Sequence, residues 1–230
     1  MRQEGGRKPR RTRAVTDAAK QARRARILSS AARLFSSHEY HAVSMAAIAR
    51  AAGLAKGTVY LYFDTKESVF LDLVSSELAA WVAHSSVRLE ETNQNATPAD
   101  VAKAVASALA ERPALIRLIA LLHVVLEQNT EREALRAFKI RLLAITEQAA
   151  GVFEQALRLE PGTGTRLVLW MHALTVGLSQ MTPQGAQVAA LVEQDPALAV
   201  FRLDLRTELE AALTLLFTPQ MPTEPRRRFS

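Results

Sequence analysis

The side chains best suited to chemistry lie together in the short stretch of residues 56–62. Lys56 can neutralise a phosphate, and Thr58 offers both a hydroxyl and a methyl group. Tyr60 and Tyr62 can reach phosphates or the edges of bases. This combination indicates contact with a nucleic acid rather than catalysis.

Two further residues of this stretch fit the same chemistry. Gly57 would let the backbone approach a partner closely, and Leu61 could contact thymine methyl groups. The alternative is a helical hairpin in a protein core, in which the tyrosines are half-buried for packing. Hydrophobic periodicity alone does not exclude that alternative.

These side chains need a rigid element to present them, and residues 44–63 have the spacing of a helix-turn-helix. Ser44 is a good N-cap for the first short helix, and Gly53 can end that helix in a left-handed conformation. The second helix, residues 56–63, would carry the contacts. We expect the following apolar residues to pack the motif against a preceding helix: Met45, Ile48, Ala49, Ala52, Val59 and Phe63.

The rest of the chain also reads as helix, because alanine and leucine dominate and proline and glycine punctuate it. The first helix shows apolar residues at helical spacing, namely Ile27, Ala31, Leu34 and Phe35. A D-x-x-E capping box at Asp64 predicts a helix that continues to about residue 91. Eight to ten helices are expected, with bounds near 18–37, 44–53, 56–63, 66–91, 114–128, 131–159, 163–181, 184–194 and 197–217, and one more helix that begins near residue 98.

The positive charge of the chain is concentrated at its start. Residues 1–26 contain ten of the 29 lysines and arginines but only two of the 23 acidic residues. A basic arm of this kind suggests a polyanionic partner, although a solubilising disordered arm is an equally good explanation of the charge alone. We expect no secretion signal and no membrane span, because no long apolar run is present.

Enzymatic function is disfavoured. The sequence contains no cysteine and none of the common nucleophile, phosphate-loop or zinc-protease motifs. His38 and His41 are three residues apart, but solvent exposure explains them better than a metal site. We therefore expect no catalytic residues, no cofactor and no metal.

Residues 26–70 resemble the DNA-binding domain of the TetR/AcrR family. The matching segment is RILSSAARLFSSHEYHAVSMAAIARAAGLAKGTVYLYFDTKESVF. It contains the I-A-x-x-A-G-L block, K-G-T-V-Y, the YF pair and D-x-K-E without a gap. The resemblance implies an all-α protein with an N-terminal three-helix DNA-binding domain and a larger helical ligand-binding and dimerisation domain. The implied order is a basic flexible arm (1–20), the DNA-binding domain (21–81, motif 44–63), the regulatory domain (82–218) and a flexible tail (219–230).

The resemblance also assigns roles to individual residues. The Ser44 hydroxyl and its helix N-terminus would hold a phosphate, and Lys66 would contact the DNA backbone. Three positions depart from the family pattern: Glu39 replaces a glycine, Ala55 cannot cap, and Ala47 cannot complete a capping box. The implied DNA-binding residues are Ser44, Lys56, Gly57, Thr58, Tyr60, Leu61, Tyr62 and Lys66.

For the second domain the resemblance implies a homodimer and a small-molecule effector. Two apolar stripes could form the dimer interface or face the monomer core; the first is Leu167, Trp170, Met171, Leu174 and Leu178, and the second is Phe201, Leu205, Leu209, Leu213 and Leu216. Polar residues in apolar helices could line an effector pocket, although partners within the fold explain them more often. These residues are His123, Glu127, Trp170 and His172.

The expected function is therefore a cytoplasmic, sequence-specific transcriptional regulator that binds an inverted-repeat operator. Repression relieved by an effector is the mode that the family implies. The alternative is a protein that binds nucleic acid through its basic arm without sequence specificity. The operator sequence, the regulated genes and the effector cannot be read from the sequence.

Overall fold

A computed structural model describes residues 10–91, 96–183 and 185–218, and every regular element among them is a helix. The chain forms two compact units. The first unit comprises residues up to Val74 together with Leu122–Phe138, and the second comprises Ser75–Leu121 and the chain from Lys139 onward. The boundary thus falls seven residues before the expected one at residue 81, within a continuous helix.

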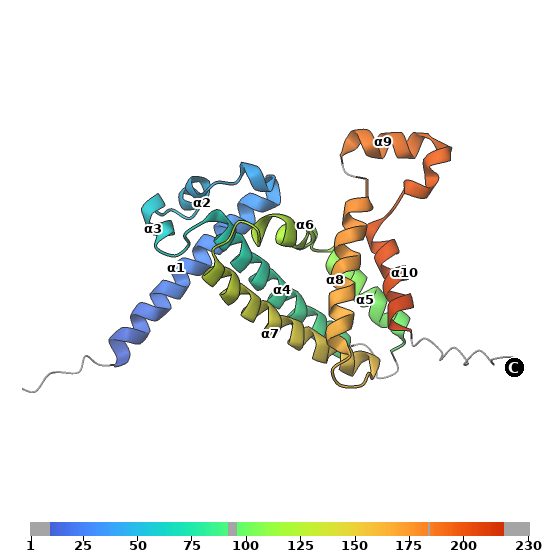
Figure 1. The fold of residues 1–230 in the computed structure, drawn as a ribbon, viewed down its shortest axis with the longest axis horizontal. Coiled ribbons are helices and arrows are strands. Elements are labelled where there is room, and N and C mark those ends of the chain that lie inside the picture. The colour runs from blue at the N-terminus through green and yellow to red at the C-terminus, as the bar shows by residue number, and fades with distance from the viewer. Residues whose placement is uncertain (1–9, 92–95, 184, 219–230) are drawn as a thin grey trace, which may run out of the picture. The chain divides into compact units, whose positions relative to one another are not determined.

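The first unit contains the predicted helix-turn-helix (Figure 1). Its first helix starts eight residues earlier than expected, so residues 10–20 of the expected flexible arm are helical. Residues 1–9 and the expected tail 219–230 lie outside the described residues. The elements are α1 (Arg10–Ser37), η1 (Tyr40–Ala42), α2 (Met45–Ala51), α3 (Lys56–Tyr60), the start of α4 (Lys66–Glu91), the π-helical segment η2 (Leu122–Leu126) and the start of α7 (Arg132–Leu157).

The core of the first unit confirms the predicted apolar contacts. The inward face of α1 packs against α2, α2 packs against α3, and Phe35 meets Phe70 edge to face with 5.4 Å between ring centroids. Edge-to-face pairs are a favoured aromatic geometry. The predicted residues that are at most 7% exposed are Ile27, Ala31, Phe35, Met45, Ile48, Ala49, Ala52, Val59 and Phe63.

The start of α4 differs from the predicted capping box. Thr65, not Asp64, caps the helix: the Ser68 amide donates to Thr65 Oγ1 at 3.1 Å, and the Thr65 amide donates to Ser68 Oγ at 3.3 Å. The predicted box is therefore wrong by one residue. Its acid, Glu67, accepts a hydrogen bond from Tyr40 instead.

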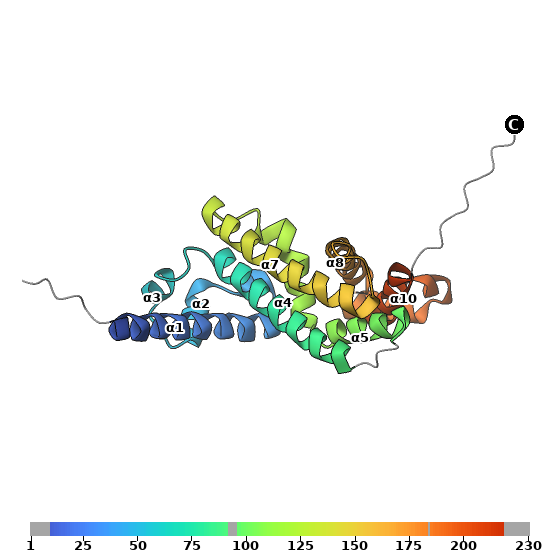
Figure 2. The ribbon, with the colours of Figure 1, turned by 90° about the horizontal axis from the view of Figure 1, so that it is seen from below.

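The second unit is a bundle in which α10 lies along α5 and beside α8 (Figures 1 and 2). Thr97 and Asp100 form a capping box at the start of α5. Besides the remainder of α4 and α7, its elements are α5 (Pro98–Ala110), α6 (Pro113–Leu121), α8 (Gly164–Met181), α9 (Ala186–Gln194), η3 (Pro196–Phe201) and α10 (Leu205–Phe217).

Two helices predicted as continuous are interrupted. The expected helix 114–128 ends as α-helix at Leu121 and continues as the π-helical η2. The expected helix 197–217 divides into η3 and α10, because Asp204 caps a new helix by accepting from the Thr207 amide at 2.9 Å. Arg202 stands between the two and donates to the carbonyls of Val192 and Glu193 at 2.9 and 2.8 Å, which ties η3 to the end of α9.

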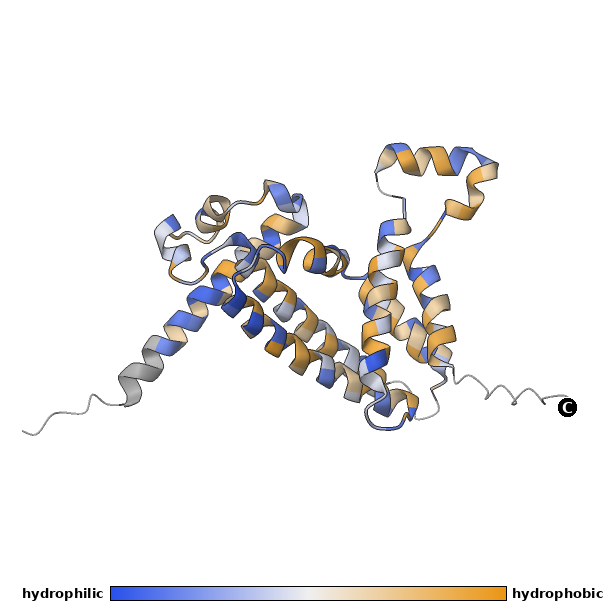
Figure 3. Cartoon of the chain, viewed as in Figure 1, coloured by the Kyte–Doolittle hydropathy of each residue, from blue (hydrophilic) through white to orange (hydrophobic). Residues whose placement is uncertain are grey.

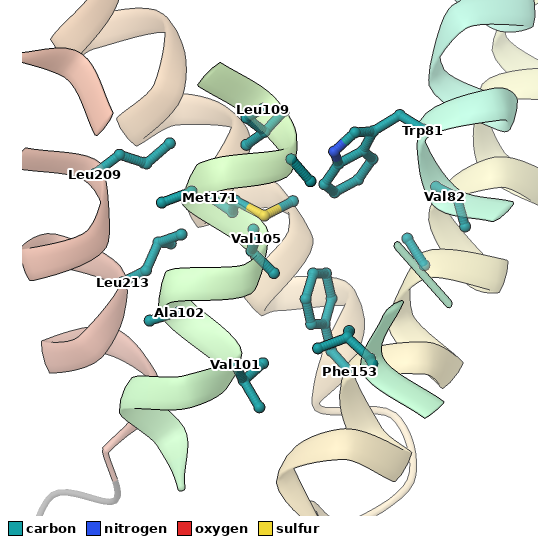
Figure 4. Packing of buried hydrophobic residues seen from close by; sticks show 14 of the residues in the cluster. Trp81, Val82, Val101, Ala102, Val105, Leu109, Phe153, Met171, Leu209 and Leu213 are labelled. Atoms are coloured by element: carbon teal, nitrogen blue, oxygen red, sulfur yellow. The ribbon is translucent and has the colours of Figure 1, made fainter. Parts of the chain in front are cut away.

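The two predicted dimer stripes face mainly the core of their own unit. Met171, Leu209 and Leu213 are at most 5% exposed and belong to one hydrophobic cluster (Figure 4). Leu167, Leu174, Leu178 and Leu216 pack against that cluster. The alternative that the stripes form the monomer core therefore holds for these residues, whereas Trp170 and Phe201 are exposed.

The turn between α7 and α8 is closed by a carboxylate. Glu154 Oε1 accepts from the amides of Gly162 and Gly164, both at 2.8 Å, and so pairs amides at the α8 N-terminus that have no partner within the helix. The α8 backbone approaches α7 so closely that a Cβ at Gly164 would lie 2.4 Å from the Ala150 carbonyl oxygen. Glycine is therefore required by packing at this position.

We predict that Gly164→Ala lowers the free energy of unfolding by about 1–3 kcal/mol, because the α7–α8 crossing must open to admit the methyl group. Urea denaturation monitored by circular dichroism would measure this change in the free energy of unfolding. Gly151→Ala is the matched control: a Cβ there has nothing within 4 Å, and alanine is the better helix former. Equal stabilities of the two variants would contradict the close crossing.

Candidate nucleic-acid interface

The turn between α2 and α3 is built as the sequence predicted. The Ser44 hydroxyl accepts from the Ala47 amide at 3.1 Å and so caps α2. Gly53 has a φ of 62°, the left-handed conformation that favours glycine. Ala55 makes no side-chain cap, as expected, and α3 is only five residues long, ending at Tyr60 rather than near residue 63.

The short α3 buries one side and exposes the other. Val59 is fully buried, whereas Tyr60 is 42% and Leu61 is 80% exposed. Lys56 is exposed, and its ammonium lies 5.8 Å from the centroid of the Tyr60 ring. Thr58 and Tyr62 are half-buried. Of the contact residues predicted between 56 and 62, Lys56, Gly57, Tyr60 and Leu61 are therefore the exposed ones.

Gly57 has no structural reason to be glycine. Its φ is not positive, and a Cβ built on it would have no neighbour within 4 Å. Alanine would therefore fit the fold, and it would favour the helix. The bare backbone at Gly57 leaves open space on the exposed side of α3.

Sequence reasoning missed the side chain that holds α3 against α4. Arg24 forms an ion pair with Asp72, donates to the Tyr62 carbonyl at 3.3 Å and stacks 4.3 Å from the centroid of the Phe63 ring. These partners are 38 to 48 residues away in sequence, so no spacing pattern could have indicated them. Arg24 therefore serves the fold of the motif.

Lys66 was expected to contact a DNA backbone, but its side chain contacts Tyr40 of the same unit. Its ammonium donates to the Tyr40 carbonyl at 3.1 Å and lies 3.9 Å from the centroid of the Tyr40 ring. Burial lowers the pKa of Lys66. The Tyr40 hydroxyl in turn donates to Glu67 Oε1 at 2.7 Å. The structure thus links η1 to the start of α4, while a phosphate contact by Lys66 stays a prediction.

The departure from the family pattern at Glu39 causes no strain. α1 ends at Ser37, and Glu39 adopts an ordinary extended conformation with a φ of −68°. The backbone at residue 39 therefore does not require a glycine.

The four predicted effector residues divide between the two units. His123 and Glu127 belong to the first unit, with 3.4 Å between Nδ1 and Oε1, whereas Trp170 and His172 belong to the second. Trp170 is 49% exposed and His172 is half-buried. The structure therefore does not group them in one compact unit.

Over the residues that the structure describes, no cluster of potential ligands could hold a metal ion. Within the same residues, no helix is long and apolar enough to cross a membrane.

A short exposed helix after a tight turn, backed by a three-helix core and followed by a larger helical unit, defines the class of helix-turn-helix transcription regulators. Comparison with family models identifies the branch. Residues 27–73 match the model of bacterial regulatory proteins of the tetR family, and residues 75–218 match the tetracyclin repressor-like C-terminal domain. The chain belongs to the TetR family of transcriptional regulators, as the resemblance implied.

Individual relatives are more distant. The fatty acid metabolism regulator protein of Bacillus subtilis is 29% identical over 65 residues, which are 28% of this chain and only 34% of that protein. Among solved structures, a TetR regulator from Rhodococcus sp. RHA1 is 18% identical with a TM-score of 0.53, covering 85% of this chain and 95% of that one. FadR from Bacillus halodurans is 18% identical with a TM-score of 0.53, covering 85% of this chain and 98% of that one. Bacillus subtilis FadR in complex with stearoyl-CoA is 19% identical with a TM-score of 0.50, covering 84% of this chain and 96% of that one. These structures share the fold.

We predict that Tyr40→Phe destabilises the protein by about 1–3 kcal/mol at neutral pH, because the hydrogen bond to the Glu67 carboxylate is lost. Burial, the same hydrogen bond and the charge of Glu67, in that order, raise the pKa of Tyr40 above its ordinary value of 10.0. Above that pH the unfolded chain loses the proton while the folded protein keeps it, so stability falls as pH rises. The advantage of the wild type over Tyr40→Phe should therefore shrink from about pH 10 upward.

Denaturation of both proteins between about pH 8 and about pH 11 would measure this difference. Tyr62→Phe is the control, because the Tyr62 hydroxyl does not connect η1 to α4. A constant difference between wild type and Tyr40→Phe across this range would contradict the proposed role of the Tyr40 hydroxyl.

Proposed function

We propose that this regulator reads a specific operator sequence with the exposed side of α3. The observation that carries the proposal is the pairing of exposed Tyr60 and Leu61 with a bare backbone at Gly57. Large exposed side chains next to open backbone suit close approach to a groove of DNA. Lys56, beside them, supplies a phosphate contact.

Positive charge on the same unit supports DNA as the partner. The exposed basic side chains near the motif neutralise phosphates and add affinity without reading bases. Arg50, which sequence reasoning did not single out, lies exposed in the last turn of α2. Among the residues of α1 and α2 whose exposure the structure describes, the other exposed basic ones are Lys20, Arg23, Arg26 and Arg33.

We further propose that the protein binds an inverted repeat as a homodimer formed by α8 and α10. One α3 reads too few base pairs for a unique site, so two-fold symmetry is expected. An apolar face of α8 remains exposed at Leu169, Trp170 and Met181, and α10, which packs beside α8, exposes Leu215. Figure 3 shows that hydrophobic residues are frequent on both helices. Ala173 and Gly177, also exposed, allow close approach of a partner helix.

Repression relieved by a small-molecule effector completes the proposal. The family and the stearoyl-CoA complex of a protein with the same fold support an effector in the second unit. α4 runs from the first unit into the second, so a ligand that favours one conformation of the second unit can change DNA binding through this helix.

Selection of bound duplexes from a random DNA pool at about 150 mM salt tests the central claim, because nonspecific phosphate binding is weakened there. An enriched inverted repeat is the expected result. Tight binding without any enriched sequence would instead favour the alternative function, nonspecific binding through the basic residues near the N-terminus.

We predict that Gly57→Ala keeps or slightly raises the free energy of unfolding but weakens operator binding at least about tenfold, since the methyl group fills the space on α3. Fluorescence anisotropy with the selected duplex measures the affinity. Gly151→Ala, in α7 of the second unit, is the control and should bind normally. Unchanged affinity in Gly57→Ala would remove this residue from the interface.

We predict that Leu169→Glu yields a folded monomer that has lost most of its operator affinity, because a buried unpaired charge opposes association. Analytical ultracentrifugation and circular dichroism would establish mass and folding. Leu143→Glu is matched in chemistry and exposure, at 56% against 58% for Leu169, but lies on α7. A Leu169→Glu protein that stays dimeric would exclude this face of α8 as the interface.

A further inference from the structure

Two hydrogen-bond donors inside the second unit have no acceptor. Trp81 and Ser85 are 3% and 4% exposed, and neither Trp81 Nε1 nor Ser85 Oγ has a hydrogen-bond partner in the protein. Leaving a buried donor unpaired costs about 1–3 kcal/mol, so such groups are rare in stable cores. Among the buried side-chain polar atoms that the structure describes, these two are the ones without a partner.

The two donors lie on the same face of α4. They are four residues apart on α4, so they lie on one face of the helix. Val82 and Leu89 are buried on that face as well, and both belong with Trp81 to one hydrophobic cluster. In Figure 4 the Trp81 indole reaches from α4 toward α5. The side chains labelled on the other helices of this cluster are hydrophobic: Val101, Ala102, Val105, Leu109, Phe153, Met171, Leu209 and Leu213.

Another hydroxyl of the same unit shows what an ordinary buried hydroxyl does. Thr175 is 1% exposed, and its Oγ1 donates to the Met171 carbonyl one turn earlier at 2.8 Å. Ser85 could use the corresponding carbonyl of Trp81 but does not. Its hydroxyl therefore remains available to an acceptor from outside the helix.

No charge accompanies these donors. None of the buried residues that the structure describes in this unit is ionisable; the polar ones are Ser75, Ser85, Ser107 and Thr175. An anion placed among them would lose its hydration without gaining a counter-charge, which costs far more than two neutral hydrogen bonds return.

We propose that the effector is an uncharged, largely aliphatic molecule whose carbonyl oxygen accepts hydrogen bonds from Trp81 Nε1 and Ser85 Oγ between α4 and α5. An ester, thioester or ketone meets this description, whereas a free carboxylate does not. The inference rests on the proposed effector-controlled function and specifies the ligand class. Binding at this place pairs both donors and so favours the ligand-bound conformation of the second unit.

Three probes of matched chain length test the ligand class on the full-length protein by calorimetry at about pH 8, where a fatty acid is ionised. Methyl decanoate and undecanoic acid are isomers that differ in charge, and undecane lacks the acceptor. Methyl decanoate should bind at least about tenfold more tightly than either of the others. Tighter binding of undecanoate, equal binding of undecane, or no binding of methyl decanoate would overturn the proposal.

Variants locate the acceptor. Ser85→Ala and Trp81→Phe should each weaken methyl decanoate about fivefold to tenfold and leave undecane unchanged, since one hydrogen bond is lost. Ser107 is another buried serine of the same unit, and Ser107→Ala should change the binding of neither methyl decanoate nor undecane. In Trp170→Phe the remaining tryptophan is Trp81, and its emission should shift to the red with methyl decanoate but not with undecane. Unaltered ester binding in both donor variants would place the ligand elsewhere.

The outcome is separable from that of the proposed function, because ligand binding is measured without DNA. A preference for the ester in a protein that selects no operator would support this site and overturn the regulator proposal. Selection of an operator by a protein that shows no preference for the ester would support the regulator proposal and overturn this site.

Discussion

The exposed surface of α3, which we propose reads DNA, depends on the burial of a few apolar side chains behind it. α3 has five residues and no side-chain cap, and so short a helix is unstable by itself in water. Val59 anchors it in the core that α1 and α2 provide, where burial of such a side chain contributes about 1.5–3 kcal/mol. Arg24 then fixes the turn that follows α3 through the Tyr62 carbonyl and the Phe63 ring. The exposed residues of α3 are thus held in place by the buried side of the motif.

The second unit uses its apolar residues for two different purposes. One side of α8 enters the core through Met171 and Thr175, while the other leaves Leu169 and Trp170 exposed. A single helix can thereby line the interior proposed to hold the effector and form the proposed dimer face. Burial without charge on the inner side favours neutral ligands, and exposed apolar area on the outer side favours self-association.

Sequence patterns predicted the helix-turn-helix well because its signals are local. Ser44 as a cap, Gly53 in the turn, and the buried positions Ile48 and Val59 follow from spacing and residue type over a few positions. The errors arose where two local signals competed. Thr65 caps α4 in place of Asp64, and Glu67 accepts a hydrogen bond from Tyr40 of another element.

The sequence by itself determined the helical class, the two-part order of the chain and the position of the helix-turn-helix, since periodicity and capping act within one or two turns. Tertiary structure alone decided which stripe of α8 is buried, because adjacent residues differ by about 100° around a helix and several faces of α8 are apolar. It also decided that Lys66 binds Tyr40 and that Trp81 and Ser85 lie buried without acceptors. Hydrogen-bond partners far apart in sequence leave no mark in local spacing.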